Sequence, residues 1–139
     1  MLKIRYYYIT ALVCVAPSLA IADQSWLEGT WENDRQQNEN AHPYLSEMED
    51  DARKNFLDRF EGLVWKFDDT VFTATSPDLG SESTGSYAIR AVDDLSFEIY
   101  GTQPEDFRFL IKKNSKGFCA TYVFEGEAIE GATQCFKKQ

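Results

Sequence analysis

Two periods of hydrophobic and polar residues divide this chain at Gly62. Over residues 43–61 apolar side chains recur at three- and four-residue spacing, which predicts one amphipathic helix. Pro43 suits the first turn of that helix, and Gly62 provides a natural stop. Beyond Gly62 the period changes to two, which is typical of strands with one buried face. The helical stripe consists of Leu45, Met48, Ala52, Phe56, Leu57 and Phe60.

Turn-forming residues separate the alternating segments and set the number of strands. The first strand is expected within residues 23–31, before the helix, and a polar connector follows at 33–40. Two segments rich in Gly, Ser or acidic residues, 76–85 and 125–131, are interpreted as loops. The other seven strands are expected at residues 63–67, 70–75, 86–92, 95–100, 106–113, 118–124 and 132–137.

The connections between these strands are mostly short. Short connections favour antiparallel neighbours, and an antiparallel meander of eight strands can close on itself and remove its edges. The sequence therefore predicts a mostly β fold, an antiparallel meander barrel of about eight strands with one α-helix inserted after the first strand. A length of 139 residues fits one such domain.

The alternation assigns large rings to one face of each strand, which we expect to be the inner face. Such rings either pack as a core or line a small apolar cavity. A buried tyrosine hydroxyl needs a hydrogen-bond partner, and a cavity supplies one as water or ligand. The candidate ligand-binding residues are therefore Trp65, Tyr87, Phe97, Phe109 and Tyr122. The full inner set is Leu63, Trp65, Phe67, Tyr87, Ile89, Leu95, Phe97, Ile99, Phe107, Phe109, Ile111, Phe118, Ala120, Tyr122, Phe124, Ala132, Gln134 and Phe136.

The first 22 residues have the layout of a secretory signal peptide. Lys3 and Arg5 precede an apolar run at residues 9–16, and Ala20-Ile21-Ala22 has the form of a cleavage site. An uncleaved anchor and a lipid-modified Cys14 are the alternatives. Cleavage leaves residues 23–139 as one domain. No Asn-x-Ser/Thr site occurs, so a secreted protein of a bacterial periplasm is favoured over a glycosylated product.

Two cysteines remain after removal of the leader, Cys119 and Cys135. They fall on the outer face of neighbouring strands, within reach of each other. An even count in an exported protein predicts a disulfide, with two free buried thiols as the alternative.

The chain is acidic, with 14 Lys and Arg against 23 Asp and Glu. Loss of Lys3 and Arg5 with the leader takes the formal net charge from −9 to −11. Binding to nucleic acid or to an anionic membrane needs clustered positive charge, so neither is expected as a partner. The expected partner is a small apolar molecule or, as the alternative, a basic protein, since the field of the chain attracts cations.

No motif for catalysis stands out. His42 is the only histidine, and we interpret it as a surface-loop residue without a metal-ligand set around it. The chain has neither a Gly-x-Ser-x-Gly elbow nor a glycine-rich phosphate loop. Among many carboxylates no pair is singled out for glycoside cleavage. The sequence therefore predicts a protein that is not an enzyme and that uses no cofactor or metal.

The Gly29-Thr30-Trp31 triplet resembles the Gly-x-Trp start of the lipocalins and their calycin relatives. This resemblance implies a barrel that holds a small apolar ligand. It also implies that Trp31 lies at the base of the barrel beneath a basic residue of the last strand, here Lys137 or Lys138. The helix after the first strand and the shorter chain differ from that family's pattern.

Two functional hypotheses follow. The first is a lipocalin-like carrier or sensor of a small apolar molecule, with the helix over one barrel mouth. The second is a periplasmic inhibitor or immunity-type protein that blocks a basic enzyme or toxin through its acidic surface and its two loops. Its candidate partner-binding residues are Glu47, Asp50, Asp51, Glu127 and Glu130. A filled barrel interior favours the second hypothesis, and a role in envelope structure or assembly remains a third.

Overall fold

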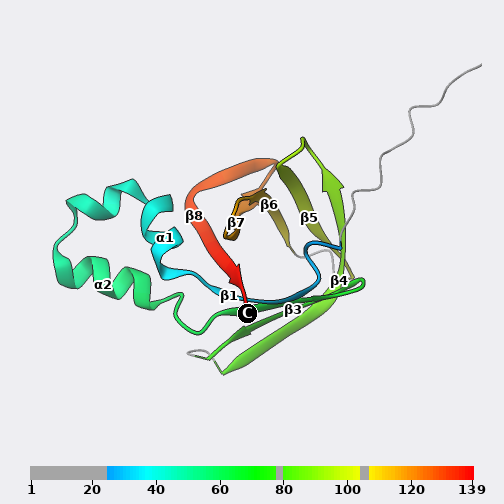
Figure 1. The fold of residues 1–139 in the computed structure, drawn as a ribbon, viewed down its shortest axis with the longest axis horizontal. Coiled ribbons are helices and arrows are strands. Elements are labelled where there is room, and N and C mark those ends of the chain that lie inside the picture. The colour runs from blue at the N-terminus through cyan, green and yellow to red at the C-terminus, as the bar shows by residue number, and fades with distance from the viewer. Residues whose placement is uncertain (1–24, 78–79, 104–106) are drawn as a thin grey trace, which may run out of the picture.

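The computed structural model describes residues 25–77, 80–103 and 107–139. Its eight antiparallel strands follow one another in chain order and close into a barrel (Figure 1). The predicted fold class is confirmed, while the predicted signal peptide and most of the turn at 103–106 lie outside the described residues. The strands are β1 (Gly29–Asn33), β2 (Val64–Asp68), β3 (Val71–Ser76), β4 (Ser81–Ala91), β5 (Ser96–Gln103), β6 (Arg108–Lys113), β7 (Gly117–Phe124) and β8 (Glu127–Lys138).

The segment between β1 and β2 forms three helical pieces, α1 (Arg35–Ala41), the 3-10 helix η1 (Pro43–Glu47) and α2 (Asp50–Asp58). The prediction of one helix over 43–61 is wrong, because Met48 and Glu49 adopt extended backbone and divide it. The connector expected at 33–40 is also wrong, since it contains α1. In Figure 1 the helical segment lies outside the barrel wall with α1 beside β8, so the expected lid over a mouth is not formed.

The described residues of both segments expected to be long loops belong largely to strands. β4 already begins at Ser81, where the 76–85 loop was expected, and β8 begins at Glu127. Glu125 and Gly126 alone connect β7 to β8, and both have positive φ, as a tight hairpin turn requires. The second hypothesis therefore loses its two reaching loops.

A wide bulge interrupts the pairing of β7 with β8. Val123 pairs with Ala128 and Thr121 pairs with Thr133, so Tyr122 alone stands opposite residues 129–132. Gly131 lies within this bulge at a φ of 83°, a left-handed conformation that glycine adopts without strain. Bulges of this kind bend a strand and are frequent beside functional sites.

Rings that contact one another occupy the centre of the barrel interior. Trp65 lies near the middle, with ring centroids of Phe136, Phe109 and Phe72 at 4.4, 4.9 and 5.2 Å. Most of the predicted inner positions are in this core or pack against it. Leu95 and Phe124 are exceptions, 61% and 55% exposed, because they lie at strand ends beside the turns.

The residues before β1 cover one end of the barrel. The Trp26 ring contacts Phe97 and Phe118 at centroid distances of 5.2 and 6.2 Å, and Leu27 is fully buried. The indole of Trp31 donates a hydrogen bond to the Leu27 carbonyl at 2.7 Å.

A lysine of the last strand fixes this cover. The Lys138 ammonium lies 5.1 Å over the Trp31 ring and donates to the Glu28 carbonyl at 2.6 Å. Lys137 instead forms an ion pair with Glu32 at 3.7 Å. A basic residue of the last strand therefore stands over Trp31, as the Gly29-Thr30-Trp31 resemblance implies, and that residue is Lys138.

Candidate functional site

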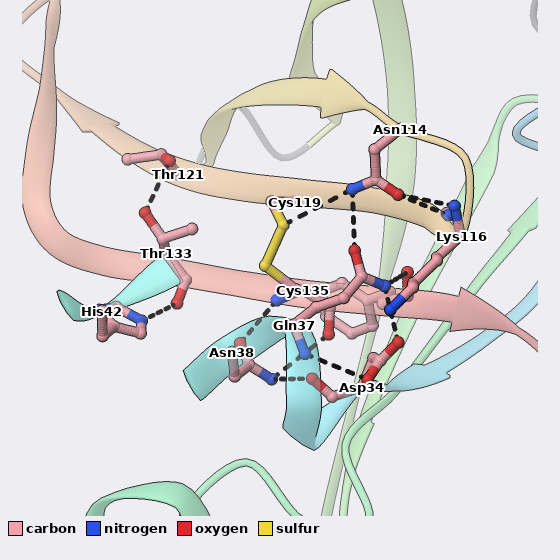
Figure 2. The surroundings of a disulfide bond; sticks show 12 residues. Asp34, Gln37, Asn38, His42, Asn114, Lys116, Cys119, Thr121, Thr133 and Cys135 are labelled. Atoms are coloured by element: carbon pink, nitrogen blue, oxygen red, sulfur yellow. Dashed lines mark hydrogen bonds between the residues drawn. A yellow bond between two sulfur atoms is a disulfide. The ribbon is translucent and has the colours of Figure 1, made fainter. Parts of the chain in front are cut away.

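One edge of β8 is completed by side chains of the helical segment. Within β8, only the last residues, from Phe136 to Lys138, pair with β1. Upstream of this point Asn38, fully buried in α1, accepts a hydrogen bond from the Cys135 N–H at 2.8 Å and donates to the Cys135 carbonyl at 3.4 Å. His42 bonds the Thr133 carbonyl through Nε2 at 2.9 Å. Figure 2 shows these side chains reaching from the helical segment to β8.

The Cys119–Cys135 disulfide lies next to this contact, and its prediction is confirmed. It joins opposite positions of β7 and β8, and Cys135 is fully buried. The turn after β6 is tied in as well, because Asn114 donates to the Gln37 side-chain carbonyl at 2.8 Å. The helix, the disulfide and two strands therefore form one fixed unit (Figure 2).

Asp34 caps the start of α1. Its carboxylate accepts from the Gln37 backbone N–H at 3.2 Å and from the Gln37 side-chain amide at 2.7 Å. Burial raises the pKa of Asp34, but the hydrogen bonds from Gln37 and the charge of Lys137 outweigh it, so that pKa lies below its usual value. The carboxylate is therefore ionised at neutral pH and satisfies the free N–H groups of the helix start.

Replacing Asn38 by alanine is expected to lower the free energy of unfolding by about 1–3 kcal/mol. The reason is that the buried Cys135 N–H would lose its acceptor. Urea denaturation followed by tryptophan fluorescence measures the change. The matched control is Asn40→Ala, an exposed position of the same helix, which is expected to shift stability by less than about 0.5 kcal/mol. Equal stability of the two variants would show that the amide does not complete the strand edge.

A groove opens between η1 and the bulge of β8, and we call it the β8 groove. Its volume is about 340 Å³. It is open to solvent on one side, and the bulge of β8 forms one of its walls. The lining residues are Ala41, His42, Pro43, Tyr44, Thr121, Ala128, Ile129, Gly131 and Thr133.

His42 forms the floor of this groove, and its interpretation as a surface-loop residue is wrong. It is only 2% exposed. Besides the Thr133 carbonyl it bonds the Tyr44 hydroxyl through Nδ1 at 3.2 Å, and its ring contacts Phe56 at 5.2 Å. Nothing in the local sequence distinguishes such a histidine, because its partners come from β8 and α2. The bond to His42 therefore holds the Tyr44 ring in position.

Exposed apolar residues line the β8 groove, and two exposed carboxylates lie near its lining residues along the chain. Tyr44 and Ile129 are 42% and 38% exposed. Glu47 follows Tyr44 by three residues in a 3-10 helix, a spacing that puts both side chains on one side of η1. Glu127 precedes the groove residue Ala128 along β8, but Glu127 pairs with Phe124 and Ala128 with Val123, so the Glu127 side chain lies on the other face of the strand. Both carboxylates are exposed, and within the described ranges neither forms an ion pair.

The predicted partner-binding residues are thus only partly brought together. Glu47 lies on the Tyr44 side of η1, and Glu127 neighbours the groove residue Ala128 along β8 but faces the other side of that strand. Asp50 is engaged by Arg53 at 2.5 Å, and Asp51 is exposed in the first turn of α2. The Glu130 side chain lies outside the described residues.

The predicted ligand-binding residues all belong to the interior or its margin. Trp65 and Tyr87 are buried, and Phe97, Phe109 and Tyr122 are partly buried. Their neighbours are mostly other rings, such as Phe109 against Tyr122 at 5.7 Å. The Tyr87 hydroxyl is buried and has no hydrogen-bond partner among the described residues. Burial, together with the charges of Glu28, Asp69 and Asp68, raises the pKa of Tyr87 to about 12, so its hydroxyl stays neutral.

Comparison of this chain with protein-family models, curated proteins and solved structures finds no match. Within the part of the chain that the structure describes, no helix is long and apolar enough to cross a membrane. In the same residues no three His, Cys, Asp or Glu side chains gather where they could hold a metal ion.

Proposed function

We propose that this chain is an exported, non-enzymatic binding protein that captures a basic protein at the β8 groove. The observation that carries the proposal is the exposure of Tyr44 and Ile129 at the groove, with the exposed carboxylate of Glu47 on the same side of η1 as Tyr44. An aromatic and aliphatic centre with a charged rim is the usual anatomy of a protein-binding site. An inhibitor or immunity-type role against a basic enzyme or toxin fits this surface.

Three further features support this proposal. The excess of acidic residues attracts a basic partner over long range, and salt weakens that attraction. The disulfide fits a location outside the reducing cytosol. The helical segment is bonded to β8 through buried side chains, so the groove is formed before any partner arrives.

Carriage of a small molecule inside the barrel is the second candidate. The Tyr87 hydroxyl favours it, because a buried polar atom without a partner is normally satisfied by water or by a ligand. The close ring contacts around Trp65 favour a binding site on the outer surface instead, because rings in contact with one another leave little room for a ligand between them. Binding at the β8 groove is therefore the stronger candidate.

Charge reversal near the groove tests the proposal. The purified protein is immobilised at low ionic strength and exposed to an envelope extract of its own host. We expect one basic protein to be retained in stoichiometric amount and released by salt. Reversing the exposed carboxylates closest along the chain to groove residues, Glu47→Lys with Glu127→Lys, is expected to weaken its binding at least tenfold, because the partner would then meet like charges.

The matched control reverses two exposed carboxylates elsewhere. Glu82 lies on β4, four strands from β8, and Asp94 lies in the turn before β5. Glu82→Lys with Asp94→Lys changes the net charge equally, so it is expected to retain most of the affinity. Equal losses in the two double variants, or no retained protein at low salt, would contradict binding at the groove.

A further inference from the structure

We infer that the β8 groove receives an arginine side chain of the partner. This inference rests on the proposed function and specifies the group that the groove recognises. It starts from the shape of the groove. A volume of about 340 Å³ lies at the low end of small-ligand pockets, so it suits one long side chain better than a helix or a strand.

The Tyr44 ring provides the central contact. Its hydroxyl is bonded to His42, and its ring makes T-shaped contacts with the rings of His42 and Phe56 at centroid distances of 5.5 and 6.0 Å. These contacts fix the ring, while the residue stays 42% exposed and lines the groove. A cation over the face of a fixed aromatic ring gains electrostatic attraction without new ordering of the ring.

The remaining walls suit the rest of an arginine. Pro43, Ala128 and Ile129 offer apolar surface for the aliphatic stem of the side chain. The hydroxyls of Thr121 and Thr133, bonded to each other at 2.8 Å, are acceptors for guanidinium N–H groups. Glu47, on the same side of η1 as Tyr44, supplies the opposite charge.

Arginine rather than lysine is favoured by the combination of ring and several acceptors. A guanidinium is planar, stacks on an aromatic face and carries five N–H donors. An ammonium is a compact, strongly hydrated charge that gives up more hydration in a partly apolar groove. The same walls would also accept citrulline by shape, which lacks the charge and provides the matched comparison.

Titration of the purified protein by heteronuclear NMR tests this inference. The probes are the blocked amino acids N-acetyl-arginine amide, N-acetyl-lysine amide and N-acetyl-citrulline amide. We expect saturable shifts of the Ile129 and Gly131 amides with the arginine probe. Its affinity is expected to be at least threefold higher than that of the lysine probe and at least tenfold higher than that of the citrulline probe.

Two substitutions of Tyr44 separate its ring from its hydroxyl. Tyr44→Phe keeps the ring and is expected to bind the arginine probe within twofold of the unmodified protein. Tyr44→Leu removes the ring and is expected to weaken that binding at least fivefold. Ile129→Asn tests the stem contact independently, and the urea midpoint of each variant verifies that it is folded.

The outcomes distinguish this inference from the proposed function. Equal affinity for the arginine and lysine probes, or full binding by Tyr44→Leu, would overturn the arginine assignment while the charge-reversal experiment could still succeed. Absence of saturable shifts at the groove with any cationic probe would also overturn it. If one of these results is found while Glu47→Lys with Glu127→Lys still loses the partner, the groove recognises a basic surface other than an arginine side chain.

Discussion

Replacing Trp65 by alanine is expected to lower the free energy of unfolding by about 3–5 kcal/mol. Trp65 is buried in the middle of the barrel, and the rings of Phe67, Phe72, Phe109 and Phe136 surround it. Its truncation removes buried apolar area and leaves a void that the strands cannot collapse to fill. Since small domains are stable by only about 5–15 kcal/mol, the variant is expected to be marginal.

Urea denaturation followed by far-ultraviolet circular dichroism measures this change without relying on the removed fluorophore. Leu95→Ala is the matched control, because Leu95 is apolar but 61% exposed, and it is expected to change stability by less than about 0.5 kcal/mol. Trp65→Phe is expected to fall between the two. A Trp65→Ala variant as stable as Leu95→Ala would mean that the barrel centre is not packed.

The same variant also tests the carrier candidate. An apolar void created in a packed core can bind small apolar molecules. Trp65→Ala is therefore expected to bind a probe such as benzene, while the unmodified protein does not. If the unmodified protein binds the probe, and substitutions at the β8 groove do not abolish that binding, carriage in the interior would be favoured.

Loss of the disulfide is expected to lower the free energy of unfolding by about 3 kcal/mol. The bridge closes a loop with a sequence separation of 16, and a loop of this size contributes about that amount by restricting the unfolded chain. The test variant is Cys119→Ser with Cys135→Ala, since Cys135 is fully buried and tolerates no added polar group there. Thermal unfolding and urea midpoints measure the loss.

Reduction with a thiol provides the control, because it breaks the bond without changing the sequence. Addition of reductant is expected to destabilise the unmodified protein and to leave the double variant unchanged. Combination with Asn38→Ala is expected to be non-additive, since Asn38 bonds the backbone of Cys135. A double variant with unchanged stability would show that the bridge does not restrict the unfolded chain.

The barrel was predictable because each strand carries its own signal. Trp65, Phe67, Ile99 and Ile111 are buried and alternate with less buried residues, and short turns fix antiparallel order. Alternation does not show, however, where a strand extends beyond the neighbours that cover its side chains. Phe124 keeps the period of its strand but sits beside the turn into β8, where no neighbour covers it.

The site was less predictable, because its contacts are non-local and polar. α1 has no apolar stripe, since its buried residues Gln37 and Asn38 face backbone groups of β8. Asp34 is a standard helix-capping residue and was the one local signal for this helix. The burial of His42 and the position of Tyr44 depend on β8, about ninety residues further along the chain.

Closure of the barrel has a kinetic consequence. β1 pairs with the end of β8, so Asn33 meets Phe136 more than a hundred positions away, and only three residue pairs make this seam. Contacts over such separations form slowly, because the chain loses much entropy before they are made. The last event in folding is therefore expected to be the joining of β1 to β8. Until then both strands offer open edges, and that interval is when self-association competes with folding.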